Sequence, residues 1–410
     1  MLREIDTIDG SILTWSTLEN PYPRYHWMRR HDPVHWSEVL QAWVLTSYED
    51  VAAAFRDLRF SSDRLSLVLQ NQLQGLDPAA VSDYVSVFGR SVLMQDPPQH
   101  TRLRKVTNHG FTHQAVAGWV SAIEKVVNEL LEGLPRAGRM DLIRDFAEPL
   151  PSIIIAELFG VPAEGRHQFY EWSNDLARFF GGAFVCDDIQ EVARDANEGA
   201  RQLKLYFKGM IEQRREDLGD DLLSQLIRGQ IEGALDEEEL CAQCVFILAA
   251  GHITLIDQIS NGIHAFLKHP AELQRLIENP SLISSAVDEV LRYDGAVPFM
   301  HRLAKEDLWV RGRLIKKNQV VFLGIGPANH DPDRFEEPDR FDITRPDNKH
   351  LSFAIGPHHC LGARLAQLEI AIALNTIFRR LPHLRLDPEH PPVLKSSLLF
   401  RGFHSLPAVY

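Results

Sequence analysis

The sequence predicts a mainly helical fold with a small β portion, and two observations lead to this prediction. Between about residues 98 and 290, apolar residues recur at i, i+3 and i+4, the spacing that places them on one face of a helix. Short β-like runs occur before residue 60 and after residue 297. Because no internal repeat or low-complexity linker interrupts the chain, and Pro and Gly are spread along it, we expect residues 1–410 to form one large domain.

Local patterns predict the N-terminal and central elements. A short helix is expected first. Two strands follow, around Pro33–Trp36 and Ala42–Thr46, and then a helix begins at Tyr48. The helical periodicity of the central region is clearest in three segments: Ile123–Leu134, Met140–Phe159 and Leu222–Ile231.

Beyond Val297 the pattern changes to short strands and one long helix. The expected strands are Trp309–Val310 and Val320–Leu323. The last long helix follows Cys360, because apolar residues recur on one of its faces: Leu361, Leu365, Leu368 and Ile372.

Another long helix is expected between Asp236 and Pro270. Asp236 is a favourable N-cap, and Glu239 three residues later approaches a capping box. The acids at 237–239 suit the positive end of the helix dipole. Since no proline intervenes, about 33 residues can extend for roughly 50 Å at about 1.5 Å per residue. Residues Cys244–Ala250 are apolar all round, which predicts a helix through the middle of the protein.

The composition narrows the class of protein. The 410 residues have a net charge of −13 and are 45% hydrophobic, so the chain can bury a large core. The acidic balance and the absence of a Lys/Arg-rich run argue against nucleic acid as a partner. No apolar stretch approaches the roughly 20 uncharged residues that span a bilayer, and the N-terminus lacks the apolar core of a signal peptide. We therefore expect a cytoplasmic protein with no membrane partner.

The four cysteines, Cys186, Cys241, Cys244 and Cys360, are too few for a disulfide scaffold. Cys241 and Cys244 have Cys-x-x-Cys spacing, but a structural zinc site needs four ligands and the sequence has no second pair. We expect both to be core residues. A functional cysteine in this chain would act as a thiolate ligand or a nucleophile.

Cys360 lies in the segment Phe353-Ala-Ile-Gly-Pro-His-His-Cys360-Leu-Gly362, just before an amphipathic helix. The amide dipoles of that helix stabilise a thiolate. Gly356 and Gly362 permit the tight turns that bring a loop close to a flat ligand, and His358 can hydrogen-bond an acid group at the edge of that ligand. A buried cysteine without a chemical role is the alternative interpretation.

This segment closely resembles the haem-binding loop of the cytochrome P-450 family, Phe-x-x-Gly-x-His-x-Cys-x-Gly. All five fixed residues match: Phe353, Gly356, His358, Cys360 and Gly362. The family often has Gly directly after the Phe, where this chain has Ala354. The resemblance covers roughly residues 20–405. It implies the cytochrome P-450 fold, a haem b cofactor with Cys360 as the axial iron ligand, and a monooxygenase in which the thiolate favours O–O cleavage.

The pair Glu289 and Arg292 adds to the resemblance. As a bare pattern, this i,i+3 pair is usually a solvated ion pair on one helix face. The family uses it, with an Arg from a later segment, to build the core near the haem, and Arg340 is the nearest candidate. The run Ala328–Arg345 is also similar to the family's, with His330 where Arg is more usual.

The resemblance assigns four residues to the haem propionates: His100, Arg104, Arg302 and His358. His100 and Arg104 are four apart, and hence on one face of a helix that begins near Asp96. A guanidinium suits a carboxylate, although each of these residues alone would be interpreted as an ordinary surface residue.

The buried stretch of the long helix contains Ala250-Gly251-His252-Ile253-Thr254, which resembles the family's Ala-Gly-x-(Glu/Asp)-Thr motif. The resemblance implies a local widening of the helix that leaves room for oxygen over the haem. The Thr254 hydroxyl would then hold the water or hydroperoxide that receives a proton. The acid that normally supplies protons is replaced by Ile253, which cannot. Either Asp257, His252 or ordered water takes over, or proton delivery is weakened and another proton source or oxidant is used.

By resemblance, the substrate pocket is lined by the region of Leu93 and Met94, by residues 179–185 and by the helix at 250–254. It is closed by Val297, Pro298, Phe299, Leu399 and Phe400. These residues are mainly apolar, which predicts a substrate with an apolar or aromatic face. The family's soluble bacterial members often tailor natural products, terpenes or fatty acids. Some act on carrier-tethered substrates, and the sequence does not separate these classes.

No flavin or nicotinamide fingerprint occurs, so electrons are expected from a ferredoxin and its NAD(P)H-dependent reductase. Arg102, Lys105 and Arg364, with nearby histidines, predict a basic patch near Cys360 that attracts an acidic ferredoxin. The expected reaction is the O2-dependent hydroxylation or epoxidation of a small molecule of secondary metabolism. The alternatives are a peroxide-using haem-thiolate enzyme, suggested by Ile253, and a non-catalytic haem-binding protein.

Overall fold

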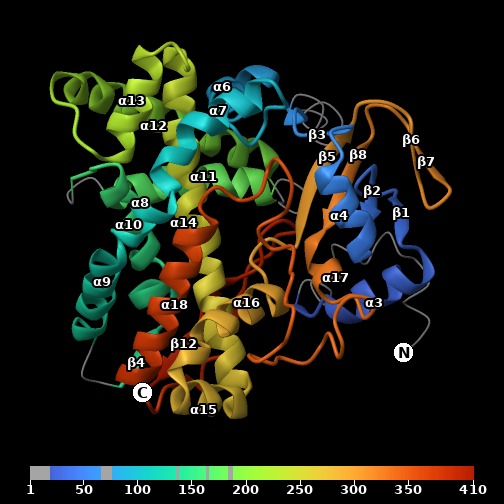
Figure 1. The fold of residues 1–410 in the computed structure, drawn as a ribbon, viewed down its shortest axis with the longest axis vertical. Coiled ribbons are helices and arrows are strands. Elements are labelled where there is room, and N and C mark those ends of the chain that lie inside the picture. Colours follow the sequence, from blue (N-terminus) through green and yellow to red (C-terminus); the bar gives the residue numbers. More distant parts are fainter. Residues whose placement is uncertain (1–18, 66–75, 135–137, 163–165, 183–187) are drawn as a thin grey trace.

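The computed structural model describes residues 19–65, 76–134, 138–162, 166–182 and 188–410. Helices fill one side of the molecule and a small sheet lies on the other, which confirms the predicted fold class (Figure 1). The helices outside the sheet region are α6 (Ser82–Arg90), α7 (Gln99–Thr107), α8 (His113–Ala117), α9 (Val120–Glu132), α10 (Pro149–Leu158), α11 (Arg166–Gly182), α12 (Ile189–Glu216), α13 (Leu222–Ile231), α14 (Glu237–Lys268), α15 (Pro270–Glu278), α16 (Ile283–Tyr293) and α18 (Ala363–Arg380).

A five-stranded sheet joins the N-terminal region to the segment after residue 297. Its strand order is β1 (Val34–Ser37), β2 (Ala42–Leu45), β8 (Val320–Gly324), β5 (Phe299–Ala304) and β3 (Phe60–Ser61). β2 and β8 pair in parallel, and the other neighbours are antiparallel. Every residue of β8 is buried. The short helices that pack beside this sheet are α3 (Tyr22–His31), α4 (Tyr48–Arg56) and α17 (Ile325–Asn329).

Smaller sheets complete the β portion. The two-stranded ones are β6 (Leu308–Val310) with β7 (Arg313–Ile315), and β10 (Val393–Leu394) with β11 (Phe403–Ser405). The three-stranded one has the order β4 (Arg139–Asp141), β12 (Pro407–Val409) and β9 (Arg385–Leu386). The strands predicted at 33–36, 42–46, 309–310 and 320–323 are therefore confirmed to within about one residue.

The helix α14 begins with the predicted capping box and runs through the centre of the molecule (Figure 1). The Glu239 amide donates to the Asp236 carboxylate at 2.7 Å, and the Asp236 amide donates to the Glu239 carboxylate at 3.0 Å. α6, α10, α12 and α18 pack around it. Because these helices cover several of its faces, 22 of its residues are buried, including Cys241 and Cys244. Both cysteines are thus core residues, as predicted.

The structure corrects the membrane argument, because α14 is long and apolar enough to cross a bilayer. Of its most apolar window, however, 72% is buried inside the protein. The apolar surface of this helix is therefore used for packing between helices. A core helix of a folded domain passes the same test of length and composition as a membrane span.

The helix predicted over Met140–Phe159 was wrong at its start. Met140 lies on β4, where it is opposite Ala408 of the C-terminal strand β12. A π-helical turn at Ile143–Ala147 and then α10 follow. The partner strand lies more than 260 residues away in the sequence, so local periodicity could not reveal it.

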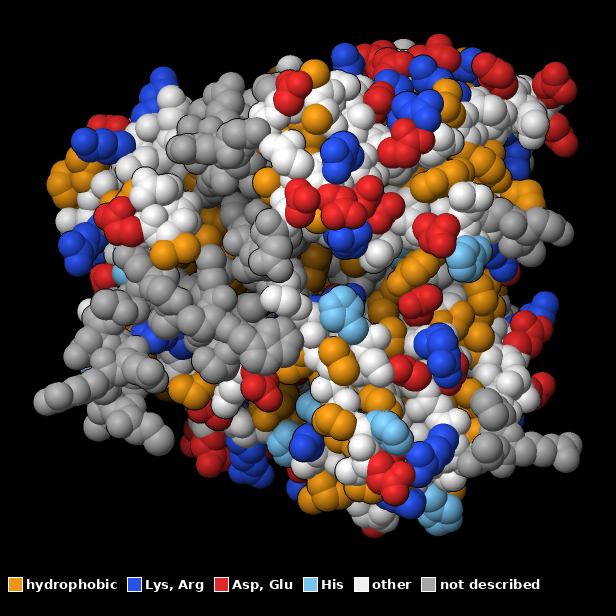
Figure 2. All heavy atoms as spheres, turned by 180° about the vertical axis from the view of Figure 1, so that it is seen from behind, with side chains coloured by type: hydrophobic (Ala, Val, Ile, Leu, Met, Phe, Trp, Pro, Cys, Tyr) orange, Lys and Arg blue, Asp and Glu red, His pale blue; other side chains and the backbone are white. Residues whose placement is uncertain are grey.

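Charged side chains of both signs are interspersed on the face opposite to that of Figure 1 (Figure 2). Many described charges are paired across the surface, as in the ion pairs of Glu238 with Lys204 and Lys208 at 2.6 and 2.9 Å. Over the part of this face that the structure describes, the net charge of −13 is therefore not gathered into one acidic field.

Candidate active site

A cavity of about 290 Å³ lies between α14, α18 and the loop that contains Cys360. Side chains from α6, α7, α10 and α11 also reach it. Most of the lining is apolar, which suits a ligand with a large apolar face. The predicted residues that line it are Leu93, His100, Arg104, Ala250, Gly251, Thr254, Val297, Arg302, Phe353, His358, Cys360 and Phe400.

The loop before α18 brings Cys360 to the cavity through close backbone contacts. The Cys360 amide donates to the Phe353 carbonyl at 2.8 Å. Gly356 has φ = 79°, and a Cβ there would lie 2.7 Å from the Phe55 carbonyl oxygen, so this turn requires glycine. Burial raises the pKa of the Cys360 thiol, while the Gly362 amide and the Arg104 guanidinium oppose that rise. These two groups stabilise the thiolate form.

Ala354 occupies the one place where this loop departs from the family pattern, and its backbone is in the left-handed region with φ = 53°. That conformation costs a residue with a Cβ about 1–2 kcal/mol, whereas glycine adopts it freely. The substitution of Gly by Ala therefore stores strain in the loop and leaves its hydrogen bonds in place. The Ala354 amide still donates to the Leu351 carbonyl at 2.7 Å.

One end of the cavity gathers cationic and imidazole groups that lack acidic partners. The rings of His100 and His358 lie 4.0 Å apart, and the Nε2 atom of His100 is buried without a hydrogen-bond partner. Within the described chain, no carboxylate forms an ion pair with Arg104 or Arg302. Burial lowers the pKa of Arg302 to about 10 and, with help from Arg302, that of His358 to about 2. The Arg302 guanidinium therefore stays charged while His358 is neutral, and a buried charge of this kind requires an anion from a ligand.

The α14 segment opposite Cys360 presents Ala250, Gly251, Ile253 and Thr254 to the cavity. The Thr254 hydroxyl donates to the Ala250 carbonyl at 3.4 Å. Gly251 packs against α10, since a Cβ there would lie 2.6 Å from the Cδ1 atom of Ile155. The structure shows α-helix throughout this segment, so the expected local widening is not observed. Small side chains, rather than a bulge, leave space in front of Thr254.

His252 and Asp257, the two residues nominated to replace the missing acid, both point away from the cavity. His252 contacts the Leu248 carbonyl at 2.9 Å and the Ser173 hydroxyl at 3.1 Å, and burial lowers its pKa to about 4. The Asp257 carboxylate accepts a hydrogen bond from the Lys395 ammonium at 2.7 Å. Neither side chain lines the cavity, whereas Ile253 does. Neither of the two residues expected to take over from the missing acid therefore reaches the cavity.

The sequence model of the cytochrome P450 family matches residues 44–401. The chain belongs to the cytochrome P450 family. Its curated relatives include hydroxylases, and it is accordingly a P450 monooxygenase. This family membership implies a haem cofactor.

The relatives are bacterial P450 enzymes of similar length. The biotin biosynthesis cytochrome P450 of Bacillus subtilis (strain 168) is 36% identical and covers 98% of this chain and 100% of its own. The vitamin D(3) 25-hydroxylase of Pseudonocardia autotrophica is 38% identical over 95% of this chain and 93% of its own. The crystal structure of P450BioI with hexadec-9Z-enoic acid ligated acyl carrier protein superposes with a TM-score of 0.88, at 35% identity, over 96% of this chain and 99% of the other.

The cavity fits a haem by its chemistry. A haem has an apolar face and two propionates at one edge, and the cavity combines an apolar lining with Arg104, Arg302 and an unpartnered His100 nitrogen at one end. Arg64 is close enough to Arg302 and His358 to lower the pKa of His358, and it adds a further buried guanidinium, 1% exposed, whose Nε atom has no partner. Residues present in this P450 thus match the acidic edge and the apolar body of the cofactor.

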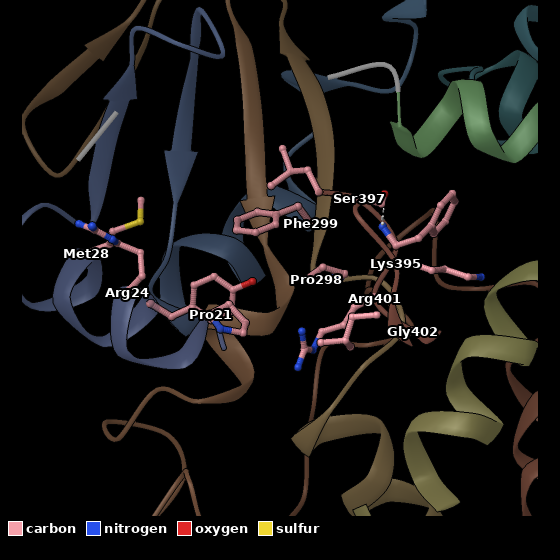
Figure 3. Close-up of a pocket in the computed structure, with 13 residues that line it drawn as sticks. Pro21, Arg24, Met28, Pro298, Phe299, Lys395, Ser397, Arg401 and Gly402 are labelled. Atoms are coloured by element: carbon pink, nitrogen blue, oxygen red, sulfur yellow. Dashed lines mark hydrogen bonds between the residues drawn. The ribbon is translucent and has the colours of Figure 1, made fainter. Parts of the chain in front are cut away.

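The expected substrate pocket is corrected in part. Met94 and Leu399 lie outside the cavity lining and are buried in the core, at 1% exposure each, because neighbouring side chains cover them. Pro298 and Phe299 line a second, smaller pocket with Arg24, Lys395 and Arg401 (Figure 3). Phe400 lines both spaces.

Residues 183–185 of the expected pocket lie outside the described residues, and Phe179 is buried in the core. Phe180, within the expected segment, does line the cavity. Sequence reasoning missed several other lining residues, which come from helix faces and strand ends brought together by packing: Phe88, Val92, Phe246, Ile247, Met300 and Glu369. Val92 is next to the predicted Leu93, and Phe246 and Ile247 precede Ala250 by about one turn of α14. Their closeness in sequence to predicted lining residues could therefore have identified them as lining residues. Glu369 has no such close neighbour among the predicted residues.

The Glu289–Arg292 pair lies away from the cavity lining in a fully buried cluster. The Arg292 guanidinium donates twice to the Glu289 carboxylate, at 2.8 Å each. The proposed third member was wrong. Arg345, not Arg340, reaches Glu289, with Nε 3.2 Å from the carboxylate, while the Arg340 side chain pairs with Glu337 at the surface. The Arg340 carbonyl accepts from both buried arginines, so its backbone rather than its side chain belongs to the cluster.

The expected basic patch is smaller than predicted. Arg102 donates to the Glu239 carboxylate at 2.5 Å and to the Ala234 carbonyl, which neutralises its charge. Lys105 and Arg364 are exposed, and no described acid pairs with either of them. The exposed part of the predicted patch therefore consists of Lys105 and Arg364.

Proposed function

We propose that the protein is a haem b monooxygenase that hydroxylates or epoxidises a largely apolar small molecule of bacterial secondary metabolism. The supporting observation is that Cys360 and Thr254 open onto one apolar cavity with an unneutralised cationic end. In the proposal, the Cys360 thiolate would bind the haem iron, and the haem would supply the activation of O2 when it is bound. Phe353 and Gly356 shape the cysteine loop. His100, Arg104, Arg302 and His358 bind the propionates.

The chain's own residues would orient the substrate and exclude water. Leu93, Val297 and Phe400 present apolar surface to the cavity, and Ala250 and Gly251 leave space beside Thr254. The Thr254 hydroxyl holds a proton at its oxygen and can donate it into the cavity. We infer that residues 1–410 act as one domain in the cytoplasm, and that a ferredoxin and its NAD(P)H-dependent reductase supply electrons near Lys105 and Arg364.

A carrier-tethered acyl chain is the substrate class that we favour. The P450 crystallised with an acyl-loaded carrier protein shares 35% identity and nearly the whole length with this chain. The apolar cavity suits an apolar acyl chain, and Phe400 lines both this cavity and the second pocket, where Arg24 is a cation and where Lys395 and Arg401 are paired with Asp257 and Asp294. Binding of an acylated carrier protein, compared with the free acid of the same chain, tests this class by the shift of the haem spectrum.

The reduced protein with carbon monoxide tests the cofactor and its ligand. We expect the red-shifted Soret band of a thiolate-ligated haem in the wild type and its loss in Cys360→Ala. An unshifted band in the wild type would contradict thiolate ligation, and a protein without haem would contradict the whole proposal.

A peroxide-using enzyme is the second candidate, because Ile253 lines the cavity where the family pattern has an acid. Turnover of the same substrate with hydrogen peroxide, compared with ferredoxin and reductase, separates the two. Faster turnover with peroxide alone would favour this second candidate.

A further inference from the structure

The hairpin of β10 and β11 brings Phe400 to the boundary between the cavity and the second pocket. Residues 395–402 join the two strands, and the Lys395 amide donates to the Gly402 carbonyl at 2.9 Å. Among the described residues, Phe400 is the only one that lines both spaces. The Phe400 side chain therefore forms a wall between the cavity and the second pocket.

The Phe400 ring rests on an apolar surface made by α11 and α14. It packs against a cluster of Ala177, Ala249 and Ile253, and a Cβ on Gly181 would collide with the ring. An acid at position 253 would place a carboxylate against these apolar side chains, which is costly. Ile253, in place of the family's acid, therefore suits the contact with Phe400.

A buried ion pair holds the base of this hairpin tip against α14. The Lys395 ammonium lies 2.7 Å from the Asp257 carboxylate, whose side chain is fully buried. Gly402 lies opposite Lys395 in the hairpin, and a Cβ on Gly402 would collide with the same carboxylate. Asp257 thus supports both arms of the hairpin, one through an ion pair and the other through close contact with the backbone.

Further contacts fix the residues on either side of Phe400. The Ser397 hydroxyl donates to the Gly181 carbonyl at 2.8 Å and accepts a hydrogen bond from the Phe400 amide at 3.1 Å (Figure 3). The Arg401 guanidinium lies 2.6 Å from the Asp294 carboxylate. Because these contacts join the ring to the rest of the hairpin tip, the position of the ring follows the position of the hairpin on α14.

We propose that the Asp257–Lys395 ion pair positions Phe400 as the wall of the cavity, and that this wall limits the length of the substrate. The inference rests on the proposed function, since it concerns how far an apolar substrate can extend. Asp257 and Lys395 are positioning residues, because neither of them lines the cavity.

The second pocket gives the wall its consequence for affinity. Phe400 closes the cavity of about 290 Å³ on the side of this pocket, whose lining is mainly apolar and includes Pro298 and Phe299. An apolar chain that passed the wall would bury further methylene groups, and each buried methylene is worth about fourfold in affinity. A wall at Phe400 therefore predicts a chain length beyond which affinity stops rising.

A series of n-alkylimidazoles of increasing tail length tests the wall in the holoenzyme. The imidazole nitrogen binds haem iron directly, so tail length is the only variable, and the shift of the Soret band gives each dissociation constant. In the wild type we expect affinity to rise with each methylene and then to reach a plateau. In Phe400→Ala it should continue to rise beyond that length, by about fourfold for each further methylene. A plateau at the same tail length in both proteins would overturn the proposal.

Lys395→Met tests the ion pair, because it keeps Phe400 and removes the charge that holds the hairpin. We expect its plateau at a longer tail than in the wild type. The double variant Lys395→Met/Phe400→Ala should show the same limit as Phe400→Ala, because the ion pair acts through the ring. A loss of stability alone would not move the plateau. A wild-type plateau in Lys395→Met would overturn the positioning role.

Lys204→Met is the matched control. The Lys204 side chain is 19% exposed, compared with 22% for Lys395, and it lies 2.6 Å from the Glu238 carboxylate. Neither Lys204 nor Glu238 lines the cavity or the second pocket, so this variant should keep the wild-type plateau. The same displacement of the plateau in Lys204→Met as in Lys395→Met would contradict a specific role of the hairpin.

Imidazole without a tail separates this inference from the proposed function. A wild type whose Soret band does not shift with imidazole contradicts the function, and this inference with it. A normal shift together with equal plateaus in wild type and Phe400→Ala contradicts only the wall. Should Lys395→Met not fold, Lys395→Gln takes its place, because the amide is uncharged and can still donate a hydrogen bond to Asp257, and its plateau decides in the same way.

Discussion

Glu289 on α16 and Glu369 on α18 are both buried carboxyls on helices that pack against each other, yet their surroundings differ completely. Glu289 accepts two hydrogen bonds from Arg292, lies 3.2 Å from the Nε atom of Arg345 and accepts a further hydrogen bond from Asn348 at 3.0 Å. Glu369 has no described partner and borders the cavity. Complete pairing makes the first acid part of a structural cluster, whereas the second acid has no described partner and burial raises its pKa well above the usual range.

Asp257 on α14 is intermediate between these two acids. It is fully buried like Glu289, but it has a single cation, Lys395, and one carboxylate oxygen without a partner. Burial outweighs the attraction of Lys395 and raises the pKa of Asp257 to about 6. The three acids thus form a series from fully paired to unpaired, and each step predicts a different response to substitution.

Removal of the fully paired charge should have the largest effect on stability. Glu289→Gln leaves Arg292 and Arg345 buried without a counter-charge, and breaking such a pair costs about 3–5 kcal/mol. Chemical denaturation of the holoenzyme measures this loss. Arg340→Ala is the control, because its exposed pair with Glu337 is worth about 0–1 kcal/mol. Equal losses in the two variants would contradict the assignment of Arg345 as the third member.

Removal of the single cation from the intermediate site should have a smaller effect, and one that depends on pH. Lys395→Met leaves Asp257 without its ion pair, and an unsatisfied buried group costs about 1–3 kcal/mol. The loss should be larger at pH 7.5, where Asp257 is ionised, than at pH 5, where it can hold a proton. The free energy of unfolding at the two pH values decides. An equal loss at both would mean that the pair is not electrostatic in origin.

The pKa of Asp257 itself predicts a slope in stability. The folded protein keeps this proton up to about pH 6, while the unfolded chain releases it near its usual value of 3.8. The stabilisation by this group is therefore fully present below about pH 4 and is lost as the pH rises to about 6. Asp257→Asn cannot titrate, so the stability of the wild type relative to this variant should fall across that window. A series of thermal unfolding curves between pH 4 and 7 gives the difference directly, and a flat difference would exclude the raised pKa.

The unpaired acid should matter least for stability. Because Glu369 is neutral and makes no described hydrogen bond, Glu369→Gln replaces one neutral group by another of similar shape, and we expect a change below about 1 kcal/mol. Chemical denaturation of the Glu369→Gln holoenzyme measures the change in the free energy of unfolding. A loss as large as that of Glu289→Gln would place Glu369 among the structural acids and remove the contrast between the two.

The elements with local signals were predictable from the sequence. Several elements depend on neighbours within a few residues: the long helix with its Asp236–Glu239 capping box, the strands at 34–37 and 42–45, and the helix Leu222–Ile231. The same holds for the cysteine loop. Its backbone takes a positive φ at Ala354 and at Gly356, so the tight turns there follow from local backbone conformation. Local capping, periodicity and turn chemistry act over the range that a sequence window covers.

Tertiary packing decided the rest, because it joins segments that the sequence keeps far apart. Met140 became a strand residue through β12, and α14 became a core helix rather than a candidate span because other helices cover it. Arg345 replaced Arg340 because the direction of a side chain depends on the path of its whole loop. The sequence by itself determined the helical class, the family and the cysteine loop, while only the folded chain decided that Asp257 faces Lys395 and Glu369 faces the cavity. The neighbours of a buried helix in space decide which of its sides contacts a cation and which lines a cavity. Residue spacing along the chain does not specify those neighbours.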